Sequence, residues 1–319
     1  CKFGEESWQG LLCLHNLKRL EVQMEVGVLI WQSILAMSSL AKLEVLEISF
    51  PNEPTGPRHR NVTKGSASIE FPLKLREQSL RKMGRVQVAI PKQACQNWRG
   101  LEVLNSVKTY VLKRPCLVTL LSNLRQLDLS PMSKPPGSLA QLASLTRLSL
   151  WKTQSVSGLS AATGMHTLSI CQPTTDAEDL DALDGLSALD TLFLAFCRLA
   201  KIPCEVTRLT ALTKLMVVGN ALGSLPPGEY ILRLTHLYLA ENQFSEIPGA
   251  LAGAVRLEVL NVQDNKALQI GGSDVEVSLG LESLRMADLG GEEKEWDRVS
   301  VRNLVRLALQ KGEGLELEV

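Results

Sequence analysis

The chain repeats one short leucine pattern at nearly constant spacing, and this periodicity restricts its fold more than any other feature. The pattern is Lxx-Lxx-L-x-L, and its clearest copies are Leu186, Leu189, Leu192 and Leu194; Leu209, Leu212, Leu215 and Val217; Ile231, Leu234, Leu237 and Leu239; and Ala254, Leu257, Leu260 and Val262. A unit this short cannot bury its own leucines. Successive units must therefore stack on one another to form a continuous core.

The second apolar position of each copy, called the anchor here, can be followed along the whole chain. The anchors are Leu17, Leu43, Met83, Leu104, Leu124, Leu145, Met165, Leu189, Leu212, Leu234, Leu257, Leu281 and Leu304, with Leu101 an alternative to Leu104. From Met83 onward the steps between anchors are 20 to 24 residues. The L-x-L part of each copy alternates apolar and variable residues, which predicts a short strand with one buried face.

A polar residue recurs eight positions after the anchor in the best copies. It is Asn220, Asn242 and Asn265, with Cys197 in the same place one repeat earlier. Where the chain turns off a strand, backbone N–H and C=O groups would be buried without partners, and a side-chain amide can both donate to and accept from them. These four residues are therefore expected to form a structural ladder between turns.

These residues resemble the leucine-rich-repeat family, and the 23-residue copies ending in Ile-Pro or Leu-Pro resemble its short intracellular type, found in Ras-group-related and plant repeat proteins. The resemblance implies an α/β solenoid of about 13 repeats, with a curved parallel β-sheet on the concave side and short helices and turns on the convex side. It is strongest from about residue 120 to 310. Before that the spacing is irregular and the asparagine position holds other residues.

The same pattern sets the expected organisation of the chain. Residues 1–319 are predicted to form a single solenoid, in which residues 1–13 are an N-terminal cap or the remnant of a truncated domain. Residues 50–70 are rich in proline and glycine and are predicted to be an inserted loop. Residues 304–309 are expected to be a repeat strand, and residues 311–319, which alternate apolar and acidic, a C-terminal capping hairpin.

Residues two, four and six positions after each anchor are predicted to project from the concave sheet, because they alternate with the buried leucines. In a chain with only 4% aromatic residues, the central repeats collect aromatic and apolar side chains at or beside these positions. The predicted partner-binding residues are Trp151, Phe193, Phe196, Met216, Val218, His236 and Tyr238. The alternatives are that these side chains only shield the sheet, or that a one-residue frame error places some of them in the core.

Composition argues against several other functions. The formal net charge is zero, so whole-molecule attraction to nucleic acid or to an anionic membrane is not expected, although residues 58–92 are basic. The seven cysteines have no zinc or redox spacing, and neither an HExxH nor a GxGxxG motif is present. We expect no metal, no cofactor, a monomer and a cytoplasmic location, with cytoskeletal, axonemal or nuclear locations as alternatives.

The function expected from these features is a non-catalytic scaffold or adaptor that binds another protein on its concave face. Two alternatives remain open. The chain could be the recognition segment of a larger signalling protein, such as a ubiquitin-ligase subunit or an immune receptor. It could also be a GTPase-activating solenoid, although repeats of that group look longer and more helical than the 20 to 24 residues found here.

Overall fold

A computed structural model describes residues 13–23, 40, 42–49, 77–81, 100–106, 122–129, 139, 142–156, 158–173, 177–291, 295–311 and 314–319. The chain forms two compact units, an N-terminal unit of Cys1–Gln154 and a C-terminal unit of Ser155–Val319. The predicted cap at residues 1–13 and the predicted loop at residues 50–70 lie almost wholly outside the described residues. The single solenoid remains a prediction.

The N-terminal unit is a run of parallel strands in chain order. Each strand is hydrogen-bonded to the next along the sequence, as consecutive repeats require. The strands are β1 (Arg19–Gln23), β2 (Val45–Ser49), β3 (Glu77–Arg81), β4 (Val103–Ser106), β5 (Gln126–Leu129) and β6 (Arg147–Trp151).

The C-terminal unit has the same kind of strand arrangement. Its strands are also parallel and paired in chain order. They are β7 (Thr167–Cys171), β8 (Thr191–Ala195), β9 (Lys214–Met216), β10 (His236–Tyr238), β11 (Val259–Asn261), β12 (Met286–Asp288) and β13 (Glu316–Glu318).

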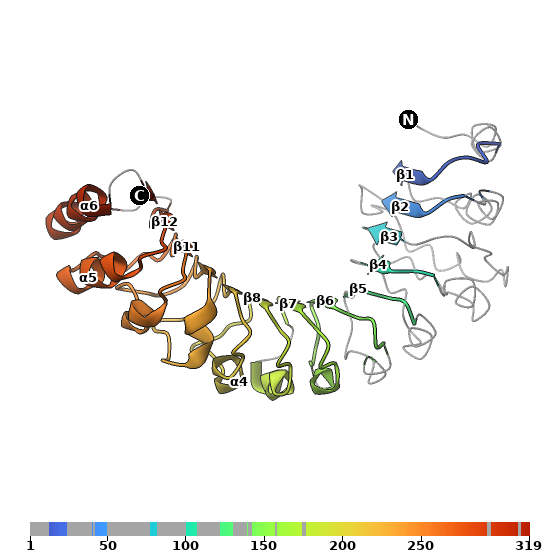
Figure 1. Ribbon diagram of the computed structural model, residues 1–319, viewed down its shortest axis with the longest axis horizontal. Helices are drawn as coiled ribbons and strands as arrows, with labels where there is room; N and C mark the ends of the chain where they lie inside the picture. Colours follow the sequence, from blue (N-terminus) through green and yellow to red (C-terminus); the bar gives the residue numbers. More distant parts are fainter. Residues whose placement is uncertain are drawn as a thin grey trace, which may run out of the picture. The chain divides into compact units, whose positions relative to one another are not determined.

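Helical segments return the chain from one strand of the C-terminal unit to the next. The α-helices are α4 (Cys204–Thr207), α5 (Gly272–Gly280) and α6 (Arg298–Lys311), and the 3₁₀ segments are Leu159–Ala161, Ala177–Leu183, Glu229–Arg233 and Gly249–Gly253. In Figure 1 these segments lie together on one side of strands β7 to β12, which leaves the opposite face of the strands uncovered by any helix. This is the predicted leucine-rich-repeat solenoid architecture.

The pattern leucines form the core between the strands and the helical side. Leu189, Leu192 and Leu194 have no exposed surface, nor do Leu215 and Leu237. Each fully buried leucine side chain contributes about 1.5–3 kcal/mol relative to an exposed one. In the described strands β4 to β11 the same slot holds a buried leucine, so within each unit the core continues from one repeat to the next.

Three strands depart from the expected register. Strand β3 precedes Met83, whereas the predicted anchor required it to follow. In β4, Val103 is aligned with Gln126, so the anchor is the alternative Leu101 and not Leu104. In β12, Met286 is aligned with Val259, so the anchor is Leu284 and not Leu281. In β4 and β12 the shift arises because leucines three residues apart fit the Lxx-L pattern in two ways. Strand β3 begins six residues before Met83, a displacement that this ambiguity does not explain.

The C-terminal segment also differs from its prediction. Residues 304–309 lie within helix α6 and do not form a strand. Strand β13 then pairs with β12 in parallel, through bonds such as Glu316 N to Arg285 O at 2.7 Å, so residues 311–319 are not a hairpin. The reason is visible in α6, where Ser300, Asn303, Leu304 and Leu307 are buried at helical spacing on one face.

Candidate functional site

Asn220 joins two consecutive turns on the side where strands β8 and β9 end. Its side-chain oxygen accepts hydrogen bonds from the backbone N–H groups of Cys197 at 2.9 Å and Leu199 at 3.1 Å. Its amide nitrogen donates to the carbonyls of Leu194 at 2.8 Å and Val218 at 3.1 Å. One side chain thus satisfies backbone groups of two repeats at once.

Asn242 and Asn265 repeat this geometry and are buried. Asn242 accepts from the N–H of Leu222 at 3.0 Å and donates to the carbonyl of Val217 at 2.7 Å. Asn265 accepts from the N–H of Phe244 at 2.9 Å and also donates backward, to Leu239 of the preceding repeat, at 3.1 Å. The three amides therefore fix the position and orientation of each turn relative to the next. These turns hold the strands that carry the exposed face.

Cys197 occupies the same position with a thiol instead of an amide. Its sulfur donates to the carbonyls of Ile170 and Ala195, both at 3.5 Å. Burial, followed by the neighbouring Cys171 thiol, raises the pKa of Cys197 to about 12. A thiol held in this way stays protonated near neutral pH, so Cys197 acts in structure and is a poor nucleophile.

A second ladder, which was not predicted from the sequence, lies at the opposite ends of the strands. The hydroxyls of Thr146, Thr213 and Thr235 each donate to a backbone carbonyl of the preceding repeat, those of Arg125, Asp190 and Thr213, at 3.3, 3.2 and 3.1 Å. These threonines all follow an anchor directly. The signal was present in the sequence as a recurrent threonine at anchor plus one.

The residue before each ladder position has a left-handed backbone. Its φ is positive at Lys152, Gln172, Phe196, Gly219, Glu241 and Asp264. All six lie seven residues after an anchor, which makes the turn a property of the repeat. Polar residues and glycine tolerate this region, but a bulky aromatic residue there is a clear outlier. Phe196 is that outlier, with φ of 54°.

Phe196 is turned out of the protein and lies over Gly219 of the next repeat. It is 42% exposed, follows the end of β8, and so lies beside the strand face and not on it. A Cβ atom added to Gly219 would come within 2.3 Å of ring atoms Cδ1 and Cε1 of Phe196. Gly219 therefore both adopts the left-handed turn, at φ of 67°, and leaves room for the ring.

The strand face beside Phe196 carries a row of large side chains. Phe193, Met216 and Tyr238 are aligned with one another across β8, β9 and β10. Neighbouring strands are about 4.8 Å apart, so the three side chains are adjacent on the face. All three are partly exposed, unlike the leucines on either side of them. With Val218 and His236, also partly exposed, they form what we call the β8–β10 patch.

The patch has a cationic margin. The Lys214 ammonium lies 5.4 Å from the Tyr238 ring centroid, within the range of a cation–π interaction. The His236 ring stacks on Tyr238, with ring centroids 6.4 Å apart, and one of its nitrogens is 2.9 Å from the Thr235 hydroxyl. Lys214 and His236 are aligned on adjacent strands. The patch thus combines apolar surface with two groups able to donate to a carboxylate.

Trp151, the remaining predicted contact residue, belongs to the N-terminal unit. It ends strand β6, is partly exposed, and has the Lys152 ammonium 5.1 Å from its ring centroid. Trp151 is therefore not part of the β8–β10 patch.

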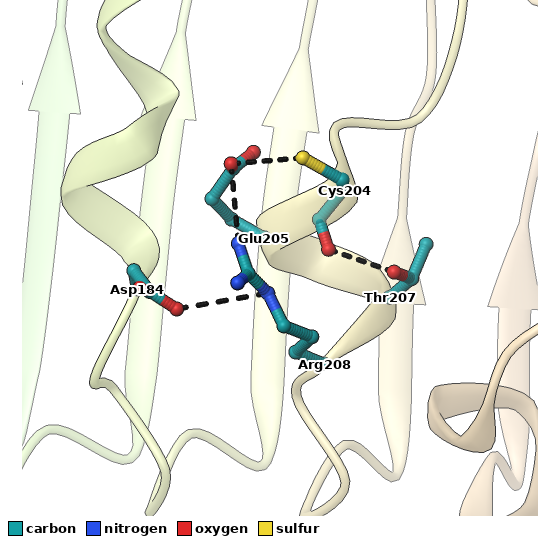
Figure 2. Close-up of polar contacts among 5 residues, drawn as sticks. All are labelled: Asp184, Cys204, Glu205, Thr207 and Arg208. Atoms are coloured by element: carbon teal, nitrogen blue, oxygen red, sulfur yellow. Dashed lines mark hydrogen bonds and ion pairs between the residues drawn. The ribbon is translucent and has the colours of Figure 1, made fainter.

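A polar cluster lies on the helical side of the C-terminal unit, around α4 (Figure 2). The Cys204 thiol donates to the Glu205 carboxylate at 3.0 Å, and this bond raises the pKa of the thiol. Arg208 bridges Glu205 at 3.4 Å and Asp184 at 3.7 Å. An exposed thiol with a raised pKa and a carboxylate beside it is not an activated nucleophile, so this cluster has the properties of a surface ion-pair network.

The part of the chain that the structure describes contains neither a metal-binding cluster nor a membrane-spanning helix. No group there of three or more His, Cys, Asp or Glu side chains could hold a metal ion. Among the same residues, no helix has the length and apolar character needed to cross a bilayer.

Comparison with known proteins agrees with this geometry. A family model described as Leucine Rich Repeat matches residues 233–254, the repeat that contains β10. No curated protein matches the chain.

Solved structures match over nearly the whole chain. An internalin (inlF) from Listeria monocytogenes is 18% identical with a TM-score of 0.63, covering 98% of this chain and 94% of that chain. Toll, in the Toll–Spatzle complex from Drosophila, is 16% identical with a TM-score of 0.65, covering 100% of this chain and 42% of that chain. TLR13, in its complex with ssRNA13, is 18% identical with a TM-score of 0.56, covering 88% and 40%. These neighbours share the fold of this chain and, together with the family match over residues 233–254, they show that the chain has a leucine-rich-repeat fold.

Proposed function

We propose that this chain is a non-catalytic binding protein that holds another protein on the β8–β10 patch. Leucine-rich-repeat proteins in general take part in protein–protein interaction. The observation that carries the proposal here is the alignment of Phe193, Met216 and Tyr238 on three adjacent strands. The core does not require these side chains, because the buried positions of the same strands are already filled by leucine.

The composition of the patch favours a protein partner. Aromatic and methionine side chains in contact with one another bury large apolar area on binding and are enriched at binding hot spots. Phe196 extends the apolar surface past the strand ends, because its left-handed backbone turns an aromatic ring outward. Backbone strain of this kind costs on the order of 1–3 kcal/mol and tends to be retained where it serves a function.

Two of the similar structures are complexes, one of Toll with Spatzle and one of TLR13 with ssRNA. They support a ligand-binding use of the fold, but neither ligand carries over to this chain. The patch supports protein over nucleic acid, because the described strands β8 to β10 carry one lysine, Lys214, and no arginine. Binding to phosphates uses several cationic contacts.

The test compares two double variants of the intact chain as affinity baits. Phe193→Ala/Tyr238→Ala removes the patch, and Leu232→Ala/Val255→Ala is the matched control, because both of its residues are about half exposed at 51% and lie off the strand face. Proteins captured from one cell extract are quantified by mass spectrometry. We expect a partner retained by wild type and control and reduced by about 30-fold or more with the patch variant, equivalent to about 2 kcal/mol.

Thermal unfolding shows whether the patch variant has lost surface contacts or core contacts. The patch variant should keep its Tm within a few degrees of wild type, because truncating partly exposed residues costs about 0.5 kcal/mol or less. Equal capture by all three baits would refute the proposal, and a large loss of Tm in the patch variant would show that the two rings belong to the core. Trp151→Ala, tested alone, reports whether the N-terminal unit contributes.

We propose a scaffold or adaptor that is monomeric and cytoplasmic and works without a cofactor. The alternative, a recognition segment of a larger signalling protein, uses the same patch and differs only in what the rest of that protein does.

A further inference from the structure

Helix α6 (Arg298–Lys311) is firmly attached to the C-terminal unit by one of its faces. Ser300 and Asn303 exchange hydrogen bonds with both backbone groups of Ile270, each at 2.7 Å. The Lys311 ammonium donates to the carbonyl of Leu281 at 2.6 Å, and Leu307 is buried. Figure 1 shows α6 beside α5, at the end of the row of helical segments. The orientation of its outer face is therefore fixed.

The outer face of α6 is unusually apolar for a helix in contact with solvent. Val299, Val301 and Val305 are 60%, 49% and 54% exposed, and they account for three of the eight large apolar side chains exposed in the described residues. Exposed valine is a poor choice for helix stability, because its β-branched side chain loses rotamer freedom against the preceding turn. Val301 and Val305 are four residues apart and so form one ridge along the helix.

The same face is basic and has no acidic residue. Arg298, Arg302 and Arg306 follow one another at four-residue spacing, and Arg298–Lys311 contains no Asp or Glu. Arg306 is paired with Glu276 of α5 at 2.9 Å. No carboxylate in the part of the chain that the structure describes forms an ion pair with Arg298 or Arg302. Two guanidinium groups are thus left beside an apolar ridge.

We propose that the outer face of α6 is a docking surface for an acidic amphipathic helix of a partner protein, separate from the β8–β10 patch. The ridge of Val301 and Val305 fits between the side-chain rows of a second helix, as in ordinary helix–helix packing. Arg298 and Arg302 then pair with carboxylates that flank the apolar stripe of that partner. Arginine suits this role, because its planar group binds a carboxylate through two parallel hydrogen bonds.

A lipid surface is a poorer match for this face. Helices that lie in a membrane interface insert Trp, Phe or Leu, which reach deeper than valine. The large apolar side chains shown exposed on α6 are all valine. The ridge is also short, with two residues at i and i+4, which suits one helix packed across it.

The experiment selects helical peptides from a displayed library against the intact chain, with one helical face randomised. We expect the selected peptides to carry Leu, Ile or Met in a stripe flanked by Asp or Glu. Their affinity, measured by fluorescence anisotropy, should fall about tenfold or more in Val301→Ser/Val305→Ser. It should also fall in Arg298→Glu/Arg302→Glu, and a peptide with Lys in place of its acidic residues should bind that variant and not wild type.

Two controls separate this surface from others. Val255→Ser, an equally exposed apolar residue off α6, should leave peptide binding unchanged. Phe193→Ala/Tyr238→Ala should leave it unchanged as well, so that failure of the β8–β10 patch does not affect this test. Peptides that are neutral or basic, or that bind the α6 variants as well as wild type, would overturn the proposal. So would valine-dependent binding to phosphatidylserine vesicles with no peptide selected.

Discussion

Replacing Gly219 with alanine should destabilise the protein for two separable reasons. The backbone at this position is left-handed, with φ of 67°, and an L-residue there costs about 1–2 kcal/mol. The new methyl group would also lie 2.3 Å from two ring atoms of Phe196, and forcing such a contact apart costs about 1–3 kcal/mol. We expect Gly219→Ala to lower the free energy of unfolding by about 2–5 kcal/mol in total.

A double-mutant cycle separates the two terms. In a Phe196→Ala background the ring is absent, so Gly219→Ala should then cost only the backbone term, about 1–2 kcal/mol. The coupling between the two positions should be about 1–3 kcal/mol, measured by urea unfolding followed by circular dichroism. Additivity within about 0.5 kcal/mol would refute the contact between ring and glycine. Glu241→Ala is the matched control, since Glu241 occupies the same turn position with φ of 53°, and it should change stability by less than about 0.5 kcal/mol.

The remaining predictions concern the ladder, the core, a buried acid and the thiols. Asn242→Ala should cost about 3 kcal/mol in urea unfolding, because it leaves buried backbone groups of two repeats without partners; a loss below about 1 kcal/mol would contradict this. Leu215→Ala should cost about 2–5 kcal/mol by the same measurement, and a near-neutral result would show that its slot is not packed. Burial raises the pKa of Asp274 above its ordinary 3.8, because the buried carboxyl group favours its protonated form. The stabilising contribution of Asp274 is therefore full below pH 3.8 and is lost as the pH rises through the pKa of the folded state. The stability of wild type relative to Asp274→Asn should therefore fall as the pH rises above 3.8, and a rise would contradict the direction of the shift. Iodoacetamide should leave Cys197 unmodified in the folded protein, because burial raises the pKa of its thiol to about 12. It should modify Cys197 once urea unfolds the chain, and peptide mass spectrometry without urea and in unfolding urea checks this.

The fold was predictable from the leucines, because each buried slot needs the same small aliphatic side chain and the spacing leaves no room for another architecture. The helix at residues 298–311 was missed for a related reason. Leu304 and Leu307 fit the start of an Lxx-L strand pattern, but they also lie on one face of a helix. The buried polar residues Ser300 and Asn303 decide between the two, since they extend the helical spacing and not the strand pattern.

The geometry of Phe196 could not be predicted from its position alone. The sequence places an aromatic residue directly after a strand, and in an ordinary strand that residue would alternate with its neighbours. The left-handed turn breaks this alternation, and only its recurrence seven residues after each anchor shows that Phe196 occupies it. A recurrent Gly, Glu or Asp at that position in later repeats was the available signal, because these residues tolerate a positive φ.

The predicted face is reliable on β8 to β10, where a ladder residue supports the register, although β1, β2, β5, β6 and β7 also keep the predicted register without one. The repeats with anchors Leu189, Leu212 and Leu234 each place Cys or Asn eight residues later, and the described strands β8 to β10 follow the predicted register. At β12 no such residue was present, and the anchor moved by three positions. Because side chains alternate along a strand, an odd shift exchanges the two faces. Ala287, predicted to project outward, is therefore 2% exposed, and the outward position is taken by Met286 instead. It follows that substitutions on β8 to β10 can be designed from the sequence pattern itself, whereas on β12 they require the strand register as well.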